Sequence, residues 1–400
     1  MSSLVTPDLL DRVRERLAHA SGEPTPAMVA AAVRAESGGV LGDTDLLAAL
    51  RVLMTELTGV GPLESLLTEP GIADVLVTAP DQVWVDCGRG LERTAVRFPD
   101  EAAVRRLAQR LALTAGRRLD DAQPWVDGRL REVGNGSFGV RLHAVLAPVA
   151  QGGTCLSLRV LRPATQGLDA LVARGAVAED AHQLLLKIIH ARLAFLVTGG
   201  TGAGKTTLLA ALLGAVDQAE RIVCVEDAAE LSPTHPHVVR LVARAPNVEG
   251  VGEVTVRDLV RQSLRMRPDR IVVGEVRGAE VVDLLTALNT GHDGGAGTVH
   301  ANSPEEVPAR LEALAALGGM DRSALHSQLA AAVQVILHVH RSSDGARRLT
   351  QIGVVTRDED GKVTIMPAWS EFIGEGPGAQ RLAHLCSRRG SFDPAPVEVP

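Results

Sequence analysis

One lysine constrains this chain more than any other residue, because lysine is nearly absent from it. Of 41 lysines and arginines only three are lysine (Lys187, Lys205 and Lys362), and Lys205 lies within GGTGAGKT at 199–206. This octet has the G-x-x-x-x-G-K-[ST] spacing of the phosphate loop of NTPases. Its glycines let backbone N–H groups turn toward a β-phosphate. We expect Lys205 to reach the β- and γ-phosphates and the Thr206 hydroxyl to bind Mg²⁺.

The residues on either side of this octet supply the structural context that a phosphate loop needs. Residues 193–198 (LAFLVT) form a short apolar run that predicts a buried parallel strand, and residues 207–216 predict a helix. A strand, a glycine-rich turn and a helix N-terminus together make an anion site. The residues predicted to bind ATP in this segment are Gly199, Gly200, Thr201, Gly202, Ala203, Gly204, Lys205, Thr206 and Thr207.

The composition excludes several other classes of protein. The net charge is −7 and aromatic residues make up 2% of the chain, which argues against a nucleic-acid surface built on basic fields or base stacking. The four cysteines have no metal-ligand spacing. No apolar run reaches the roughly 18 residues that span a bilayer, and the charged N-terminus lacks the core of a signal peptide. We therefore expect a cytoplasmic protein whose contact with a membrane is peripheral or made through partners.

The order of apolar patterns predicts an α/β fold with several parts. A phosphate-loop domain with a parallel α/β sheet is expected after a small α+β domain and an N-terminal helical segment, because strands and helices alternate beyond residue 176. The sequence also suggests a capping box at Thr255 to Asp258 at the start of one helix. The predicted divisions are a helical segment at 1–58, an α+β domain at 59–163, a linker at 164–175, the ATPase domain at 176–372 and a disordered tail at 373–400.

Two further strands of the predicted ATPase domain end in carboxylates. Residues 221–226 (RIVCVE) end at Glu226 with Asp227 next, and residues 270–275 (RIVVGE) end at Glu275. Strand ends beside a phosphate loop face the nucleotide in open α/β sheets. Glu226 and Glu275 are therefore candidates for orienting or deprotonating the attacking water, and Asp227 could hold Mg²⁺ through water. A charged turn or strand end without a catalytic role is the alternative, and the sequence does not choose the general base.

A histidine at the end of a later strand completes the set of candidates. His300 follows the glycine-rich stretch 291–297, and a neutral histidine there can hydrogen-bond a γ-phosphate or a neighbouring residue. A lone histidine at a strand end is more often structural. The arginines are dense, and phosphoryl transfer gains most from those that meet the γ-phosphate. For any one of them a surface ion pair is the more common role.

These motifs together resemble the secretion ATPases of type II and type IV systems, in particular the branch that drives Tad/Flp pilus assembly. The resemblance covers about residues 57–340 and keeps the order of the family's segments. The segments are GVGPLESLL at 59–67, GRRLD at 116–120, LSLRVLRP at 156–163, VCVEDAAEL at 223–231, HVVRLVARAPNVEGVGEVTVRDLVRQSLRMRPDRIVVGEVRG at 237–278 and LNTGHDGGAGTVHANS at 288–303.

The resemblance implies a hexameric cytoplasmic ATPase ring. It implies that each subunit has an N-terminal domain and a RecA-like C-terminal domain, with ATP and Mg²⁺ bound between them. It implies that Glu226, Glu275 and His300 line the hydrolysis site, and that Arg141 and Arg159 are N-terminal-domain arginines that reach the phosphates. The implied partners are further copies of the chain and the platform proteins of a pilus or secretion system in the inner membrane, without direct binding of nucleic acid.

We therefore expect a Mg²⁺-dependent ATPase that converts domain closure into work on a pilus-assembly platform. Two alternatives stay open at this point: a type IV secretion ATPase that moves protein or DNA, and a nucleotide-dependent switch that is not a motor. The two carboxylates and His300 argue against the switch, since a switch has less need of a hydrolysis site. The acidic net charge and the scarcity of aromatic residues argue against a nucleic-acid translocase.

Overall fold

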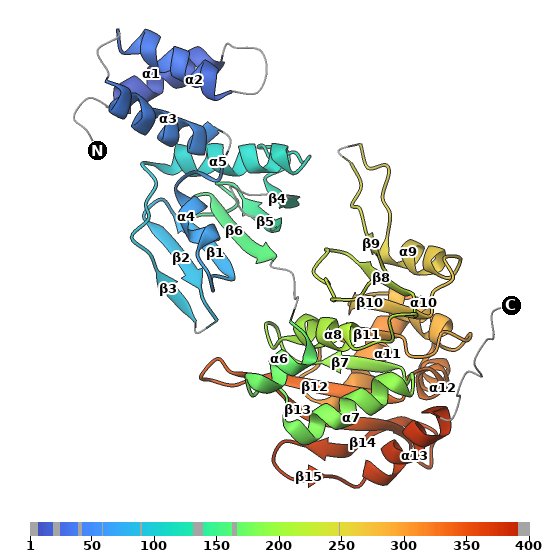
Figure 1. The fold of residues 1–400 in the computed structure, drawn as a ribbon. Helices are drawn as coiled ribbons and strands as arrows, with labels where there is room; N and C mark the ends of the chain where they lie inside the picture. Colours follow the sequence, from blue (N-terminus) through green and yellow to red (C-terminus); the bar gives the residue numbers. More distant parts are fainter. Residues whose placement is uncertain are drawn as a thin grey trace, which may run out of the picture. The chain divides into compact units, whose positions relative to one another are not determined.

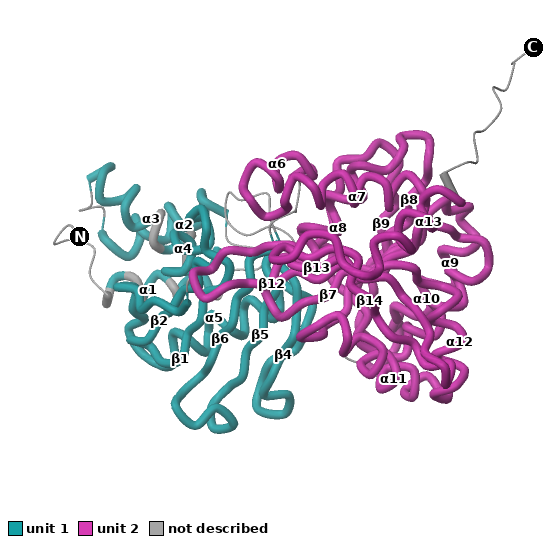
Figure 2. Tube along the Cα trace, turned by 90° about the horizontal axis from the view of Figure 1, so that it is seen from below, with its two compact units in different colours: residues 1–162 teal, residues 163–400 magenta. Residues whose placement is uncertain are grey.

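The computed structural model describes residues 7–18, 25–38, 42–57, 59–88, 90–130, 139–161, 166–247 and 249–390. The chain divides into two compact units, residues 1–162 and 163–400, which are coloured separately in Figure 2. The first unit contains three N-terminal helices followed by a six-stranded sheet with further helices, and the second contains a nine-stranded sheet with helices.

Three N-terminal helices of the first unit have a core of their own (Figure 1). They are α1 (Pro7–Ala18), α2 (Pro26–Glu36) and α3 (Asp43–Leu57). Leucine and valine side chains at helical spacing form this core, and Val13, Val33 and Leu53 are completely buried in it. The predicted N-terminal helical segment is therefore present.

The rest of the first unit is an antiparallel sheet that shares one core with α5 and with the short helices η1 and α4. The order of the strands is β3-β2-β1-β6-β5-β4, and α5 (Glu101–Thr114) buries Val104, Leu107 and Leu111 against the sheet. The Asp100 side chain caps α5 by accepting a hydrogen bond from the Ala103 N–H at 2.7 Å. The elements are η1 (Gly61–Leu63), α4 (Glu64–Thr68), β1 (Asp74–Ala79), β2 (Gln82–Asp86), β3 (Leu91–Arg93), β4 (Trp125–Leu130), β5 (Gly139–Val145) and β6 (Cys155–Leu161).

The sheet of the second unit is parallel around the phosphate loop and antiparallel at one edge. Its order is β15-β14-β13-β12-β7-β11-β10-β8-β9, with parallel pairing from β12 to β9. One strand, β11, separates the phosphate-loop strand β7 from the acidic strand β10. This mixed sheet agrees with the RecA-like domain that the resemblance implies. The strands are β7 (Phe195–Thr198), β8 (Ile222–Glu226), β9 (Val238–Val242), β10 (Arg270–Val276), β11 (Ala296–Val299), β12 (Val335–Arg341), β13 (Arg347–Arg357), β14 (Val363–Ser370) and β15 (Gly374–Glu375).

Helices cover both faces of this sheet and give it two cores (Figure 1). Successive residues of β7 alternate between them, since Phe195 and Val197 pack in one core and Leu196 packs in the other. The capping box at the start of α9 is present, with Thr255 and Asp258 bonded reciprocally. The helices are α6 (Leu168–Ala173), α7 (Glu179–His190), α8 (Lys205–Gly214), α9 (Val256–Ser263), α10 (Glu280–Leu288), η2 (Pro304–Glu306), α11 (Val307–Leu317), α12 (Arg322–Ala332) and α13 (Ala379–Gly390).

Two predicted boundaries are wrong. The linker expected at 164–175 contains α6, whose Leu168 and Leu171 are buried in a core of the second unit. The tail expected to be disordered from residue 373 contains β15 and α13, and Leu382 is 2% exposed in the same core. Both segments are rich in glycine or arginine, which suggested chain without regular structure. Each nevertheless places leucine side chains in the core, and this burial outweighs the local composition. Residues 391–400 lie outside the described residues.

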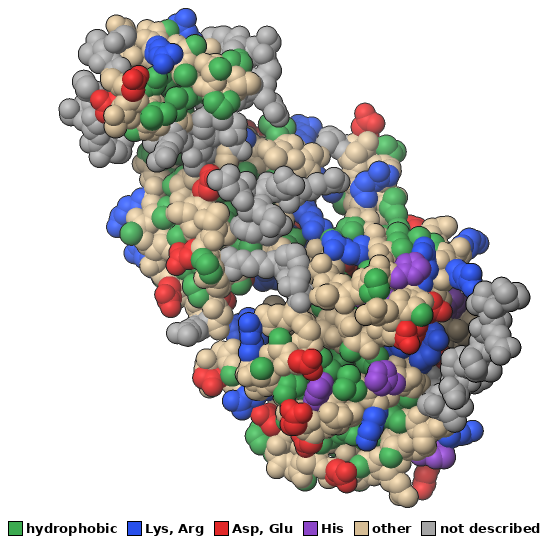
Figure 3. All heavy atoms as spheres, viewed as in Figure 1, with side chains coloured by type: hydrophobic (Ala, Val, Ile, Leu, Met, Phe, Trp, Pro, Cys, Tyr) green, Lys and Arg blue, Asp and Glu red, His purple; other side chains and the backbone are tan. Residues whose placement is uncertain are grey.

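The surface carries charges of both signs. The face drawn in Figure 3 shows basic and acidic side chains interspersed, without one continuous basic field. Among the described residues, no helix is long and apolar enough to cross a membrane.

A buried ion pair at the start of β10 fixes one end of the parallel sheet. Arg270 is 1% exposed, and it donates to the Glu220 carboxylate at 2.8 and 3.0 Å and to the Ile189 carbonyl at 2.9 Å. Replacing Glu220 with alanine should lower the free energy of unfolding by about 3–5 kcal/mol, because a buried guanidinium loses its counter-ion. Urea denaturation would measure this loss.

The matched control is Glu371→Ala, which removes the partner of Arg348, a residue whose side chain is about half exposed. Exposed pairs contribute up to about 1 kcal/mol, so this variant should stay close to the wild type. Equal, small losses in both variants would show that water reaches Arg270 and replaces its partner.

Candidate functional site

The phosphate loop is held in shape by glycines that no other residue could replace without strain. Gly199, Gly202 and Gly204 have φ angles of 151°, 69° and 98°. A Cβ atom on Gly199 would lie 2.2 Å from the Val339 carbonyl oxygen, so β12 packs directly against the loop. The loop leads straight into α8, whose first residue is Lys205. The first backbone N–H groups of α8 have no acceptor within the helix, so this helix end suits an anionic ligand.

Lys205 lies over the loop rather than in solvent. It is 7% exposed, and its Nζ donates to the carbonyls of Gly199 at 3.0 Å and Gly200 at 2.8 Å. Burial lowers the pKa of Lys205, while the charges of Glu275 and Glu230 raise it. The ammonium is therefore positioned at the loop before any ligand arrives.

His300 connects Lys205 to Glu275. Its Nδ1 lies 3.3 Å from Lys205 Nζ, and its Nε2 lies 2.8 Å from Glu275 Oε1. Because an ammonium can only donate, Nδ1 must accept, and Nε2–H then donates to the carboxylate. Burial lowers the pKa of His300 and Lys205 lowers it further, against the opposing effect of Glu275. The imidazole is thus neutral at pH 7 and joins a cation to a carboxylate.

The second oxygen of Glu275 is bonded to Arg277, and Arg277 also reaches Asp227. The Arg277 Nη2 lies 3.0 Å from Asp227 Oδ2. Asp227, which was expected near Mg²⁺, is therefore paired with Arg277 at the carboxyl ends of β8 and β10.

Glu226 is more deeply buried than the other candidate carboxylate. It is 3% exposed, and its Oε1 accepts hydrogen bonds from the N–H groups of Glu230 at 2.9 Å and Leu231 at 2.8 Å. Its Oε2 is buried and has no partner among the described residues. Burial raises the pKa of Glu226 to about 7. One oxygen of this carboxyl group thus stabilises the turn after β8, and the other oxygen makes no hydrogen bond to the described residues.

This raised pKa makes a prediction about stability without nucleotide. The folded protein binds the Glu226 proton more tightly than the unfolded chain, so the stabilisation is complete below about pH 4.5 and is lost as the pH rises through about 7. The free energy difference between wild type and Glu226→Gln should therefore change by about 3 kcal/mol across this window. The free energy of unfolding of Glu226→Gln, compared with that of the wild type, should therefore increase as the pH rises toward 8. Chemical denaturation of both proteins at several pH values would measure the change, and a constant difference would contradict it.

Glu230 is a site residue that the sequence analysis missed. Thr206 Oγ1 lies 3.5 Å from Glu230 Oε2, and Glu230 also acts on Lys205 electrostatically. The sequence offered a clue to this residue, because Glu230 comes four residues after the candidate Glu226, in the turn that follows β8. A hydroxyl and a carboxylate are the hard oxygen ligands that Mg²⁺ prefers. The described residues hold no cluster of three or more metal-ligating side chains, so the remaining ligands would come from phosphate and water, as is usual for Mg²⁺.

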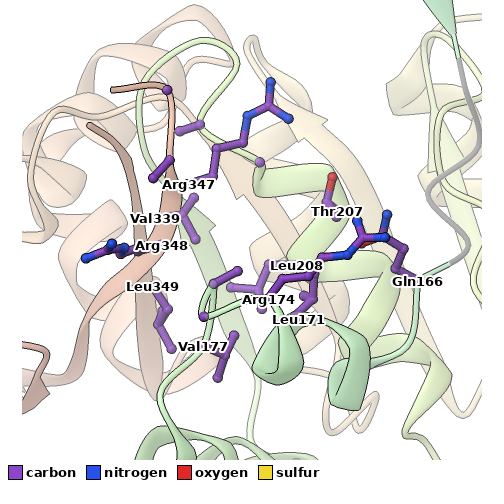
Figure 4. Close-up of a pocket in the computed structure, with 16 residues that line it drawn as sticks. Gln166, Leu171, Arg174, Val177, Thr207, Leu208, Val339, Arg347, Arg348 and Leu349 are labelled. Atoms are coloured by element: carbon purple, nitrogen blue, oxygen red, sulfur yellow. The ribbon is translucent and has the colours of Figure 1, made fainter. Parts of the chain in front are cut away.

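A cavity of about 390 Å³ adjoins the loop at Gly204 and Thr207 (Figure 4). Its wall is apolar at Leu171, Val177 and Leu208, and it includes the arginines Arg174 and Arg347. A pocket of this size with an apolar wall and a few polar groups suits a nucleoside. The remaining lining residues are Gln166, Gly175, Ala176, Ala203, Val339, Gly345, Ala346, Arg348 and Leu349.

Arg141 and Arg159 belong to the first unit and are engaged there. They face each other in the register of β5 and β6. Arg141 Nη2 lies 2.7 Å from Asp127 Oδ2, and Arg159 Nε lies 2.9 Å from Asp74 Oδ1. Both arginines are part of ion pairs on the sheet of that unit.

Comparison with known proteins gives a family and a set of relatives. A family model described as type II/IV secretion system protein matches residues 56–364. A protein of Mycobacterium tuberculosis strain H37Rv, provisionally named a conjugal transfer protein, is 70% identical over 352 residues, which are 88% of this chain and 100% of that protein. The type IV secretion system protein PtlH of Bordetella pertussis is 31% identical over 70% of this chain and 89% of its own length.

Solved structures were matched as well. The VirB11 ATPase of the Brucella suis type IV secretion system, crystallised with sulphate, is 25% identical and aligns with a TM-score of 0.39 over 75% of this chain and 97% of that chain.

Proposed function

This chain belongs to the family of type II/IV secretion system proteins, and on that premise we propose that it is an ATP-hydrolysing motor. The observation that carries the proposal is the link from Lys205 through His300 to Glu275 at the end of a phosphate loop. A cation for the phosphates and a carboxylate for water are joined there through one neutral imidazole. A protein that only bound nucleotide would not need the carboxylate for water that His300 connects to Lys205.

The proposed reaction transfers the γ-phosphoryl group to water. The water oxygen bonds to the γ-phosphorus as the bond to the β–γ bridging oxygen breaks, and the products are ADP, phosphate and one proton. Lys205 and the N–H groups of the loop would stabilise the charge on the phosphates. Glu275 would orient the water and accept its proton. Thr206 and Glu230 would hold Mg²⁺, which would neutralise charge on the phosphates.

Glu275 is the better candidate for the general base, and Glu226 is the rival. Glu275 is partly exposed and can meet water, whereas Glu226 is 3% exposed and gives one oxygen to two backbone amides. A pKa near 7 would nevertheless suit Glu226 as a base if the turn opened when ATP binds.

The direct test is hydrolysis of ATP by the purified full chain. We expect phosphate release that requires Mg²⁺ and stops when EDTA is added. Absence of hydrolysis by assembled, folded protein at saturating ATP and Mg²⁺ would contradict the proposal.

We further propose that the work is assembly of a Tad/Flp-type pilus, with the chain held at the inner face of the cell membrane by platform proteins. The branch-like segment at 237–278 supports this. The name of the mycobacterial relative supports a second candidate, conjugal transfer. Deleting the gene in its native host should remove surface pili and leave DNA transfer intact. The opposite result would favour the conjugal role.

Hydrolysis should depend on assembly of a ring, which we propose to be a homohexamer. The family resemblance suggests that Arg141 and Arg159 reach the phosphates, and both arginines lie outside the unit that holds the phosphate loop. We propose that assembly supplies such contacts from a neighbouring subunit. Contacts of this kind can raise turnover by about 10³-fold or more. Specific activity should therefore rise with protein concentration in a dilution series monitored by light scattering. A monomer with constant specific activity would contradict this prediction.

A further inference from the structure

A second cavity, of about 420 Å³, lies between the start of the phosphate loop and the carboxyl end of β12. It is lined by Gly200, Thr201, Asn302, His338, His340, Arg341 and Ser342, and it shares no lining residue with the cavity beside Gly204. Side chains of a strand alternate between the two faces of its sheet. Val339 lines the first cavity, whereas His338 and His340 line the second, so β12 separates the two.

The position of this cavity connects it with the hydrolysis site. Asn302 comes two residues after His300, and Thr201 belongs to the phosphate loop itself. The cavity therefore touches the loop at Gly200 and Thr201 and the segment after β11 at Asn302, whereas the nucleoside-sized cavity touches the loop at Gly204 and Thr207.

His338 presents an unused polar atom in this region. The residue is 7% exposed, and its Nδ1 is buried with no hydrogen-bond partner in the described part of the chain. In the parallel register of β12 and β7 its neighbour is Thr198, which is fully buried and whose Oγ1 also lacks a partner among those residues. Buried polar atoms are nearly always hydrogen-bonded, so two such atoms at one register position indicate that an ordered water or a ligand completes them.

Arg341 brings positive charge to the same cavity. A Cβ atom on Gly202 would lie 3.4 Å from Arg341 Nη1, so the guanidinium reaches the phosphate loop within its own subunit. Burial lowers the pKa of His338, and His340 and Lys205 lower it further, while the charges of Glu305 and Glu306 raise it. The lining offers no apolar wall for a base, and its guanidinium disfavours a bound cation. Arginine and amide donors beside a backbone loop instead match an oxyanion.

We propose that this cavity holds the orthophosphate produced by hydrolysis, with Arg341, Asn302 and His338 as its ligands, before the phosphate leaves the protein. The inference rests on the proposed ATPase function. Hydrogen phosphate has three acceptor oxygens and one P–OH group. A guanidinium and an amide supply donors for the oxygens, and a neutral imidazole supplies one donor and one acceptor. Phosphate would then depart without passing the nucleoside cavity, while ADP stays bound.

The first test is binding of inorganic phosphate to the full chain saturated with ADP, measured by calorimetry. ADP occupies the loop, so the titration reports a further phosphate site. Arg341→Gln and Asn302→Ala should each weaken phosphate binding about tenfold, with ADP affinity unchanged within about twofold. The matched control is Arg357→Gln, an arginine on β13 that donates to the Ser327 carbonyl at 3.1 Å. Equal phosphate affinity in wild type and both cavity variants would overturn the proposal.

The second test follows phosphate formed from ATP itself and so separates product from free phosphate. In a single turnover, quenched samples report bond cleavage and a fluorescent phosphate sensor reports release. Wild-type release should lag behind cleavage, and Arg341→Gln should shorten the lag about tenfold while cleavage stays within about threefold. Release without a lag in the wild type, or an equal fall in cleavage and release in the variant, would also overturn it.

Thermal unfolding of each variant shows whether it is folded. If Arg341→Gln is unstable, the phosphate affinity of Asn302→Ala tests the proposal instead. Failure of ATP cleavage in the wild type would instead contradict the proposed function.

Discussion

Replacing Lys205 with alanine should abolish ATP hydrolysis, with turnover falling by at least about 10³-fold. Lys205 is the cation that the structure holds at the loop, through the Gly199 and Gly200 carbonyls and next to His300. Removing it takes away the charge that would meet the β- and γ-phosphates, so ATP affinity should fall as well. Steady-state phosphate release and equilibrium nucleotide binding measure the two effects.

Lys362→Ala is the matched control, because Lys362 is an exposed lysine in the turn between β13 and β14. Its turnover and nucleotide affinity should equal those of the wild type. Wild-type turnover in Lys205→Ala, with contaminating ATPases excluded, would end the interpretation of residues 199–206 as a catalytic phosphate loop.

Replacing Glu275 with glutamine should preserve ATP binding and lower turnover by about 10²-fold or more. Glutamine keeps the size of the side chain and a carbonyl oxygen that can accept from His300, but it cannot take a proton from water. Nucleotide affinity and single-turnover cleavage, measured on the same preparation, separate binding from chemistry. Loss of binding with unchanged cleavage per bound ATP would make Glu275 a structural residue.

Glu312→Gln controls for loss of a carboxylate that lies between a histidine and an arginine. Glu312 contacts His326 Nε2 at 2.9 Å and Arg322 Nε at 3.0 Å on α11 and α12, among residues that line neither cavity. Its turnover should stay near that of the wild type. Glu226→Gln, assayed in parallel, identifies the base: the variant with the larger loss of cleavage at full ATP occupancy marks the stronger candidate.

The sequence by itself determined the phosphate loop and most of the parallel sheet. The loop motif is local, since its glycines and Lys205 act within eight consecutive residues. Buried parallel strands such as β8 and β10 are continuous apolar runs, so their boundaries could be predicted within one or two residues. The capping box at Thr255 was equally local. By contrast, β3 and β4 were not predicted, because short strands with glycine or charged residues lack a clear period.

Only the tertiary structure decided how the candidate residues meet. Lys205 and His300 are 95 positions apart, and they come within hydrogen-bonding distance because β7 and β11 pair in parallel with both strand ends at one edge. The same packing buried Glu226 and aligned His338 with Thr198. Burial, strand register and the pKa of a carboxyl group depend on neighbours distant in the chain. A pattern of residue types therefore identified which groups are candidates, and the fold determined their partners.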